Sequence, residues 1–122
     1  MRTIILAFAL LSLATPVIAA SVGPYQVDTR LTDRGSSMAF DASVSGGDAC
    51  EQLAVTVRLA DGSSDQEAKV SDTIERYKPS FRGRVQADIQ VSTGAGISKW
   101  YVSDIVLRCV NKGESRQYRL ND

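Results

Sequence analysis

Alternation of apolar and polar side chains at every second position is the feature that most limits how this chain can fold. From Ser21 onward no segment has the apolar period of a helix. A period of two is typical of a strand that buries only one face. Segments with this pattern, clear or weak, are separated by turn-forming residues and cover 25–31, 38–45, 53–60, 67–74, 81–91, 100–110 and 116–120. The pattern therefore predicts seven short strands in antiparallel sheets.

The most apolar of these segments is 100–110, which also holds the only tryptophan. Apolar residues stand at both alternating sets of positions in this segment. That arrangement predicts a strand that is covered on both faces or lies in the centre of its sheet. The residues that follow, 111–113, fit a three-residue hairpin loop with Gly113 in the left-handed conformation.

The two cysteines give an independent constraint on the fold. Cys50 opens the third predicted strand and Cys109 closes the sixth. In the immunoglobulin arrangement the third and sixth strands are antiparallel neighbours, so a Cys50–Cys109 disulfide fits that architecture. Cys50 is one position out of phase with the apolar residues of its strand, which predicts an irregularity near residues 51–52. We therefore predict a seven-stranded antiparallel immunoglobulin-like β-sandwich with one disulfide.

The N-terminal segment has the pattern of a secretory signal peptide. Arg2 is followed by an unbroken apolar run, and small residues occur at 19 and 20. The alternative is a membrane anchor, but the run is shorter than a spanning helix requires and Pro16 falls near its end. We expect residues 1–20 to be a signal peptide cleaved after Ala19 or Ala20. Residues 21–122 then form a single immunoglobulin-like domain that is periplasmic or secreted, where disulfides form.

Charge and composition exclude several classes of function. Without Arg2 the chain has 13 basic residues (14 minus 1) against 14 acidic ones, which argues against nucleic-acid binding and against attachment to a membrane surface. The chain contains no histidine, so it lacks the commonest general base and metal ligand. We expect no enzymatic activity, no cofactor, no metal and no membrane insertion after cleavage.

The basic stretch 76–84 is the first candidate surface for a protein partner. Its candidate contact residues are Arg76, Tyr77, Lys78, Arg82 and Arg84. The simpler interpretation, which we favour because Arg82 and Arg84 fall on the polar positions of a strand, is that Phe81 enters the core and that the charged residues line a solvated strand face.

A second candidate surface is the glycine-containing loop 92–99 together with the residue that follows it. The candidate contact residues here are Lys99 and Trp100. Loops at the ends of a sandwich often carry recognition. Burial of Trp100 under the loop is the alternative, and we favour it.

The stretch 40–46, then Cys50, and the strand and turn at 53–62 resemble small exported bacterial immunoglobulin-like modules. Curli-assembly inhibitors of the periplasm are similar in size, leader and strand count, although their close-spaced cysteines are absent here. The resemblance implies a domain that modulates the assembly of extracellular fibres.

Together these features predict non-catalytic binding of another protein, as an inhibitor, an immunity-type protein or a chaperone-like protein that caps edge strands. The alternative is a structural or adhesive subunit that assembles with itself at the cell surface. A hydrolase of unrecognised type is the third hypothesis and the one we expect least.

Overall fold

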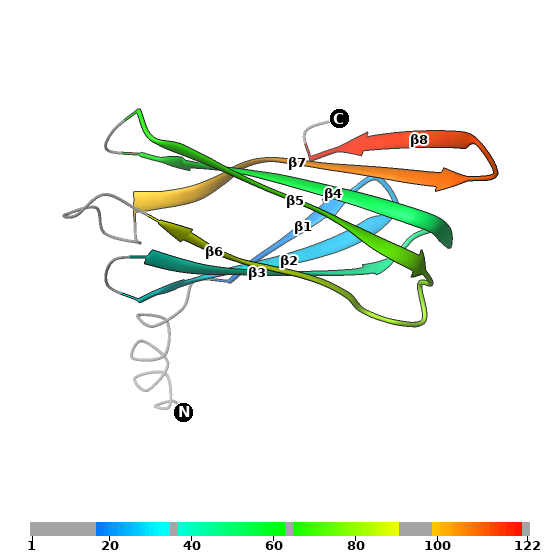
Figure 1. Cartoon of the computed structure of the whole chain (residues 1–122), viewed down its shortest axis with the longest axis horizontal. Helices are drawn as coiled ribbons and strands as arrows, with labels where there is room; N and C mark the ends of the chain where they lie inside the picture. Colours follow the sequence, from blue (N-terminus) through cyan, green and yellow to red (C-terminus); the bar gives the residue numbers. More distant parts are fainter. Residues whose placement is uncertain (1–16, 35–36, 63–64, 91–98, 121–122) are drawn as a thin grey trace, which may run out of the picture.

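The computed structural model describes residues 17–34, 37–62, 65–90 and 99–120, and within these ranges the chain is all-β. Eight strands form two antiparallel four-stranded sheets (Figure 1). The first sheet has the order β1-β2-β3-β6, and the second has the order β5-β4-β7-β8. The strands are β1 (Val17–Val22), β2 (Tyr25–Asp33), β3 (Ser37–Gly46), β4 (Cys50–Asp61), β5 (Glu67–Tyr77), β6 (Gly83–Gln90), β7 (Trp100–Asn111) and β8 (Glu114–Arg119).

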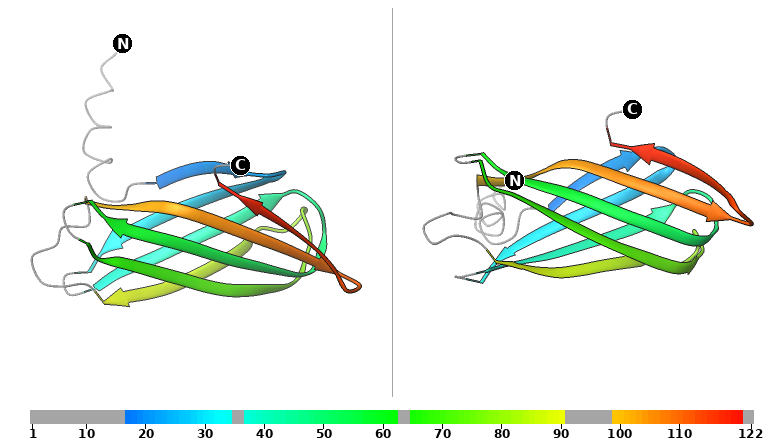
Figure 2. Two further views of the ribbon diagram at one scale, coloured as in Figure 1. Left: turned by 90° about the horizontal axis from the view of Figure 1, so that it is seen from above. Right: turned by 45° about the horizontal axis from the view of Figure 1, so that its top comes forward.

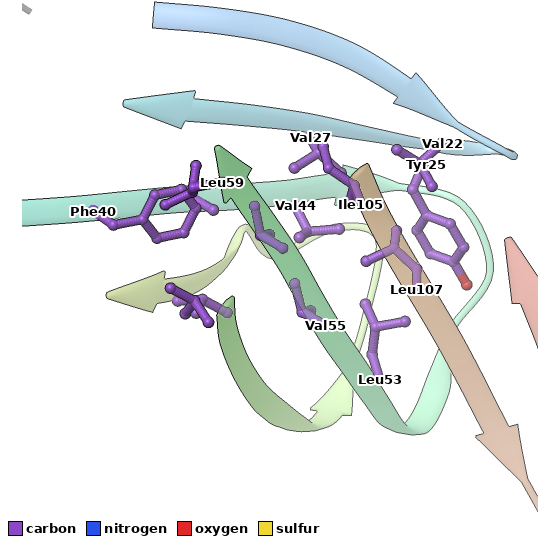
Figure 3. Packing of buried hydrophobic residues seen from close by; sticks show 14 of the residues in the cluster. Val22, Tyr25, Val27, Phe40, Val44, Leu53, Val55, Leu59, Ile105 and Leu107 are labelled. Carbon is purple, nitrogen blue, oxygen red and sulfur yellow. The ribbon is translucent and has the colours of Figure 1, made fainter. Parts of the chain in front are cut away.

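The two sheets lie one over the other and enclose a single apolar core (Figure 2). The period-two pattern determines which residues fill it, because every second residue of β3 from Met38 to Val44 is buried. Phe40 of the first sheet and Leu53 and Leu107 of the second are almost completely inaccessible to solvent (Figure 3). Burying each such side chain contributes about 1.5–3 kcal/mol.

The structure has eight strands rather than the seven predicted. The additional strand is β1, which pairs with β2 over six residue pairs, from Val17–Arg30 to Val22–Tyr25. Residues 17–20 of this strand belong to the segment predicted to be a signal peptide, and that prediction kept them out of the strand count. Residues 1–16, which carry the rest of the signal-peptide pattern, lie outside the described residues. No helix among the described residues is long and apolar enough to cross a membrane.

The central position predicted for the apolar segment 100–110 is confirmed, because β7 lies between β4 and β8. Its two sets of apolar residues have a different cause from the one expected. The pairing of β7 with β4 shifts in register between Arg58 and Leu59. Trp100 is buried before the shift and Ile105 after it. In a regular strand these two residues would lie on opposite faces of the sheet. A β-bulge of this kind exchanges the inward and outward positions along a strand.

The turn between β7 and β8 is shorter than predicted. Asn111 pairs with Glu114, so the loop contains only Lys112 and Gly113. Both residues have positive φ, 50° and 83°, as a two-residue hairpin turn requires. The left-handed conformation predicted for Gly113 is confirmed.

The predicted disulfide between Cys50 and Cys109 is present. It joins the start of β4 to the end of β7, which are antiparallel neighbours. The side chain of Asn111 connects the same segments, since its Oδ1 accepts from the Glu51 amide (2.8 Å) and its Nδ2 donates to the Ala49 carbonyl (3.0 Å). The irregularity predicted near residues 51–52 also occurs: the β4–β5 ladder omits the pair Glu51–Arg76, and Arg76 has a φ of +52°.

Candidate partner-binding surface

The structure divides the seven predicted contact residues between two ends of the sandwich. Along β4, Cys50 at one end pairs with Tyr77, and Asp61 at the other end pairs with Trp100. The basic stretch 76–84 therefore begins beside the disulfide, whereas Lys99 and Trp100 lie at the opposite end of the molecule (Figure 1). The chain thus has two separate candidate surfaces.

The connection between β5 and β6, residues 78–82, is a tight turn. The Phe81 amide donates to the Lys78 carbonyl (3.0 Å), and Pro79 occupies the second turn position, where its fixed φ is favourable. After the turn, the start of β6 lies close against β5, because a Cβ at Gly83 would come within 2.6 Å of Ile74 Cδ1. We call residues 78–82 the β5–β6 turn.

Phe81 is exposed at the tip of this turn, and the expectation that it enters the core is wrong. Its side chain is 64% accessible to solvent. Strand β6 begins only at Gly83, so the alternation that buries Val85 does not extend back to Phe81. Lys78 and Arg82, which flank it, are also exposed. The sequence signals for this outcome were Pro79 and Gly83, which confine the strand to the residues after the turn.

Tyr77, the last residue of β5, anchors the start of the β5–β6 turn in the core. Its side chain is only 2% exposed, so its ring lies in the core and not at the predicted contact surface. The hydroxyl donates to the Gly46 carbonyl (2.6 Å), which ties the end of β5 to the end of β3 in the opposite sheet. The ring also packs edge-on against Tyr25 (5.9 Å between centroids), and Tyr25 packs in the same way against Tyr118 (5.7 Å).

Burial raises the pKa of Tyr25 from 10.0 to about 12, and burial also raises the pKa of Tyr77. Desolvation disfavours the phenolate in the folded state, whereas the unfolded chain releases the Tyr25 proton near pH 10. The stabilising contribution is therefore complete below pH 10 and is lost as the pH rises from 10 to 12. One such group changes the free energy of unfolding by at most about 1.4 kcal/mol per pH unit.

We therefore expect wild-type stability, measured by denaturant unfolding at several pH values, to fall steeply between pH 10 and 12. Tyr25→Phe should flatten this dependence, whereas Tyr101→Phe, which alters an exposed tyrosine, should leave it unchanged. Equal slopes for the wild type and Tyr25→Phe would contradict this explanation.

Arg82 and Arg84 face the outer side of the first sheet. Arg84 forms an ion pair with Asp41 of β3 (2.7 Å), and both side chains are partly exposed. A surface pair of this kind contributes about 0–1 kcal/mol. Arg82 and Arg84 also line a shallow hollow with Asp28, Arg30 and Asp41. The hollow therefore carries both acidic and basic side chains. Arg82 connects it to the basic β5–β6 turn.

At the opposite end, the expected burial of Trp100 is confirmed at 7% exposure. Its indole N–H has no hydrogen-bond partner among the described residues. Lys99 is exposed, and its carbonyl accepts from the Gly62 amide (2.7 Å). Tyr101, which the sequence did not single out, is 49% exposed. Residues 91–98, which make up most of the predicted contact loop, lie outside the described residues.

The chemistry available at both surfaces is recognition by aromatic and charged side chains. Within the ranges that the structure describes, no group of three or more His, Cys, Asp or Glu could hold a metal ion. The comparisons with known proteins find no matching family model, no matching curated protein and no matching solved structure.

Proposed function

We propose that the chain is exported from a bacterial cell and acts there as a non-catalytic module that binds another protein. The observation that carries this proposal is Phe81, exposed between Lys78 and Arg82 on a turn closed by a backbone hydrogen bond. Aromatic residues and arginine are enriched at protein interfaces. A turn fixed by Tyr77 would lose little conformational entropy on binding, so its contacts would translate efficiently into affinity.

The immunoglobulin-like class is part of this proposal. Without β1, the sheets have the orders β2-β3-β6 and β5-β4-β7-β8. The third and sixth strands of that set, β4 and β7, are then central neighbours joined by the disulfide, as the immunoglobulin arrangement places its third and sixth strands. Export is supported by the signal-peptide pattern and by the disulfide, which persists in oxidising compartments.

A role as a soluble binding protein, such as an inhibitor, an immunity-type protein or a chaperone-like protein, agrees better with the edge strands than a role as a self-assembling subunit. Strand β5 forms one edge of the second sheet, and its exposed residues include Glu67, Lys69, Asp72 and Glu75. Charges on an edge strand oppose strand-to-strand association. Size-exclusion chromatography at increasing concentration tests this directly, because concentration-dependent polymers would favour the structural or adhesive alternative.

Affinity capture with matched variants tests the binding function. The oxidised chain is used to capture proteins from a periplasmic extract, in parallel with Phe81→Ser and Tyr101→Ser. Truncation of an interface aromatic at a hot spot costs roughly 2 kcal/mol or more, about a thirtyfold loss of affinity. We expect a stoichiometric partner that Phe81→Ser loses and Tyr101→Ser retains. Recovery of no stoichiometric partner would refute the proposal, and equal recovery by both variants would exclude the β5–β6 turn.

A further inference from the structure

Strand β1 covers one edge of the first sheet with residues that export would remove. It pairs with β2 through six residue pairs, and four of these involve residues 17–20. Hydrolysis after Ala20, with water as co-reactant, leaves a carboxylate on the leader and an amine on Ser21. Only the pairs Ser21–Gln26 and Val22–Tyr25 then remain. On its β1 side, β2 therefore loses its neighbour from Val27 to Arg30.

The edge that this exposes is regular. Strand β2 contains neither proline nor glycine, and its nine pairs with β3 run without a register shift. Alternate residues are buried, as in the burial of Val27 and Leu31. From Val27 to Asp33 its charged residues are Asp28, Arg30 and Asp33, which are of mixed sign. Unpaired backbone groups on such an edge are a template for another strand.

We propose that, in the processed chain, the edge of β2 from Val27 to Asp33 binds an extended segment of a partner protein antiparallel to β2. The chemistry of the occupant follows from the strand seated there before processing. Ala20 packs against the core and Ala19 is exposed, so the segment needs apolar residues at alternate positions. Main-chain hydrogen bonds supply affinity in this mode of recognition, and the alternate side chains supply specificity.

This inference rests on the export part of the proposed function, because the edge stays covered while residues 17–20 remain attached. It is independent of Phe81. The order β1-β2-β3-β6 places β2 and the β5–β6 turn toward opposite edges of the first sheet (Figure 2). A single exported chain would thus present two surfaces, one for a folded partner and one for an extended segment, which approach each other only at the hollow that Arg82 and Asp28 line.

Disulfide trapping with a synthetic peptide of residues 15–20, which ends where the processed chain begins, tests the proposal. The peptide carries cysteine in place of Ala19, which in the full chain pairs with Asp28. The processed chain carries Asp28→Cys or, as the matched control, Thr32→Cys four positions further along the same edge. Because strand pairing fixes register, we expect trapping by Asp28→Cys to be at least about tenfold faster. Full-length Asp28→Cys, in which residues 17–20 occupy the edge, should not be trapped.

Equal trapping at the two positions, or none at either, would overturn the proposal. Trapping of two Asp28→Cys chains to each other in place of the peptide would also overturn it, because the edge would then belong to a second copy. If the processed chain is unfolded alone, recovery of its fold on addition of the peptide supports the proposal, and failure to recover refutes it.

The Phe81→Ser substitution separates this proposal from the previous one, since it should abolish partner capture and leave trapping unchanged. An exported chain that retains residues 17–20 would refute the open edge and leave export standing. Partner capture without any trapping would refute the edge alone.

Discussion

Replacing both disulfide cysteines, Cys50→Ala with Cys109→Ala, is expected to lower the free energy of unfolding by about 4 kcal/mol. The disulfide closes a loop with a sequence separation of 59 residues. In the chain-entropy argument, opening a loop of this length restores about 4 kcal/mol of conformational entropy to the unfolded chain. For a domain of this size that is a large share of the total stability, which is about 5–15 kcal/mol.

Denaturant unfolding of the double variant and of the reduced wild type measures this effect. Both should unfold at a lower denaturant concentration than the oxidised wild type. The hydrogen bonds of Asn111 to the Ala49 and Glu51 backbone remain, so we expect the variant to keep its strands at low temperature. A change of less than about 1 kcal/mol would contradict the predicted contribution.

Gly47→Ala is expected to destabilise the fold by about 2–5 kcal/mol. Gly47 has a φ of +71°, and a Cβ at this position would overlap the ring of Tyr25. The left-handed conformation costs a residue with a Cβ about 1–2 kcal/mol. Displacing a buried ring costs about 1–3 kcal/mol more. Tyr25 lies in the core between the two sheets (Figure 3), so its displacement disturbs the packing of the whole disulfide end.

Gly113→Ala is the matched control for this substitution. Gly113 also has a positive φ, +83°, but nothing lies within 4 Å of the position of its Cβ. The free energy of unfolding of Gly113→Ala should therefore fall only by the conformational cost, about 1–2 kcal/mol. Thermal or denaturant unfolding of the two variants isolates the contribution of the Tyr25 contact. Equal losses would show that the ring moves aside without cost.

Much of the fold could be predicted from the sequence because a strand that buries one face has apolar residues at every second position. The alternation in 38–45 and 53–60 corresponds to β3 and β4, and segment 67–74 is part of the edge strand β5, which is longer than predicted. The Cys50–Cys109 disulfide was also predictable, since only two cysteines are present and their strands are neighbours.

The errors in the fold have identifiable physical causes. Strand β1 was missed because an apolar run ending in small residues is typical of a leader as well as of a strand. The β-bulge opposite Arg58 and Leu59 was missed because a register shift depends on how two strands pair, and neither strand shows it alone. Its trace was the presence of apolar residues at both alternating sets of positions in 100–110, which we attributed to the central place of the strand.

The candidate surface was predicted less completely than the fold. Arg76, Lys78 and Arg82 are exposed as a binding role requires, whereas Tyr77 lies in the core between them. Exposure of Phe81 follows from where β6 begins, and a strand boundary is less sharply encoded than a strand interior. The partner-binding role of the exposed residues stays a prediction.

Hydrogen exchange of the chain, alone and with its captured partner, tests the central proposal most directly. If the β5–β6 turn is the contact surface, the backbone amides of Lys78, of residues 80–82 and of the adjoining ends of β5 and β6 should exchange more slowly in the complex. The Tyr101 end should be unaffected. Unchanged exchange in the β5–β6 turn, with protection elsewhere, would contradict the assignment of partner binding to Phe81 and its basic neighbours.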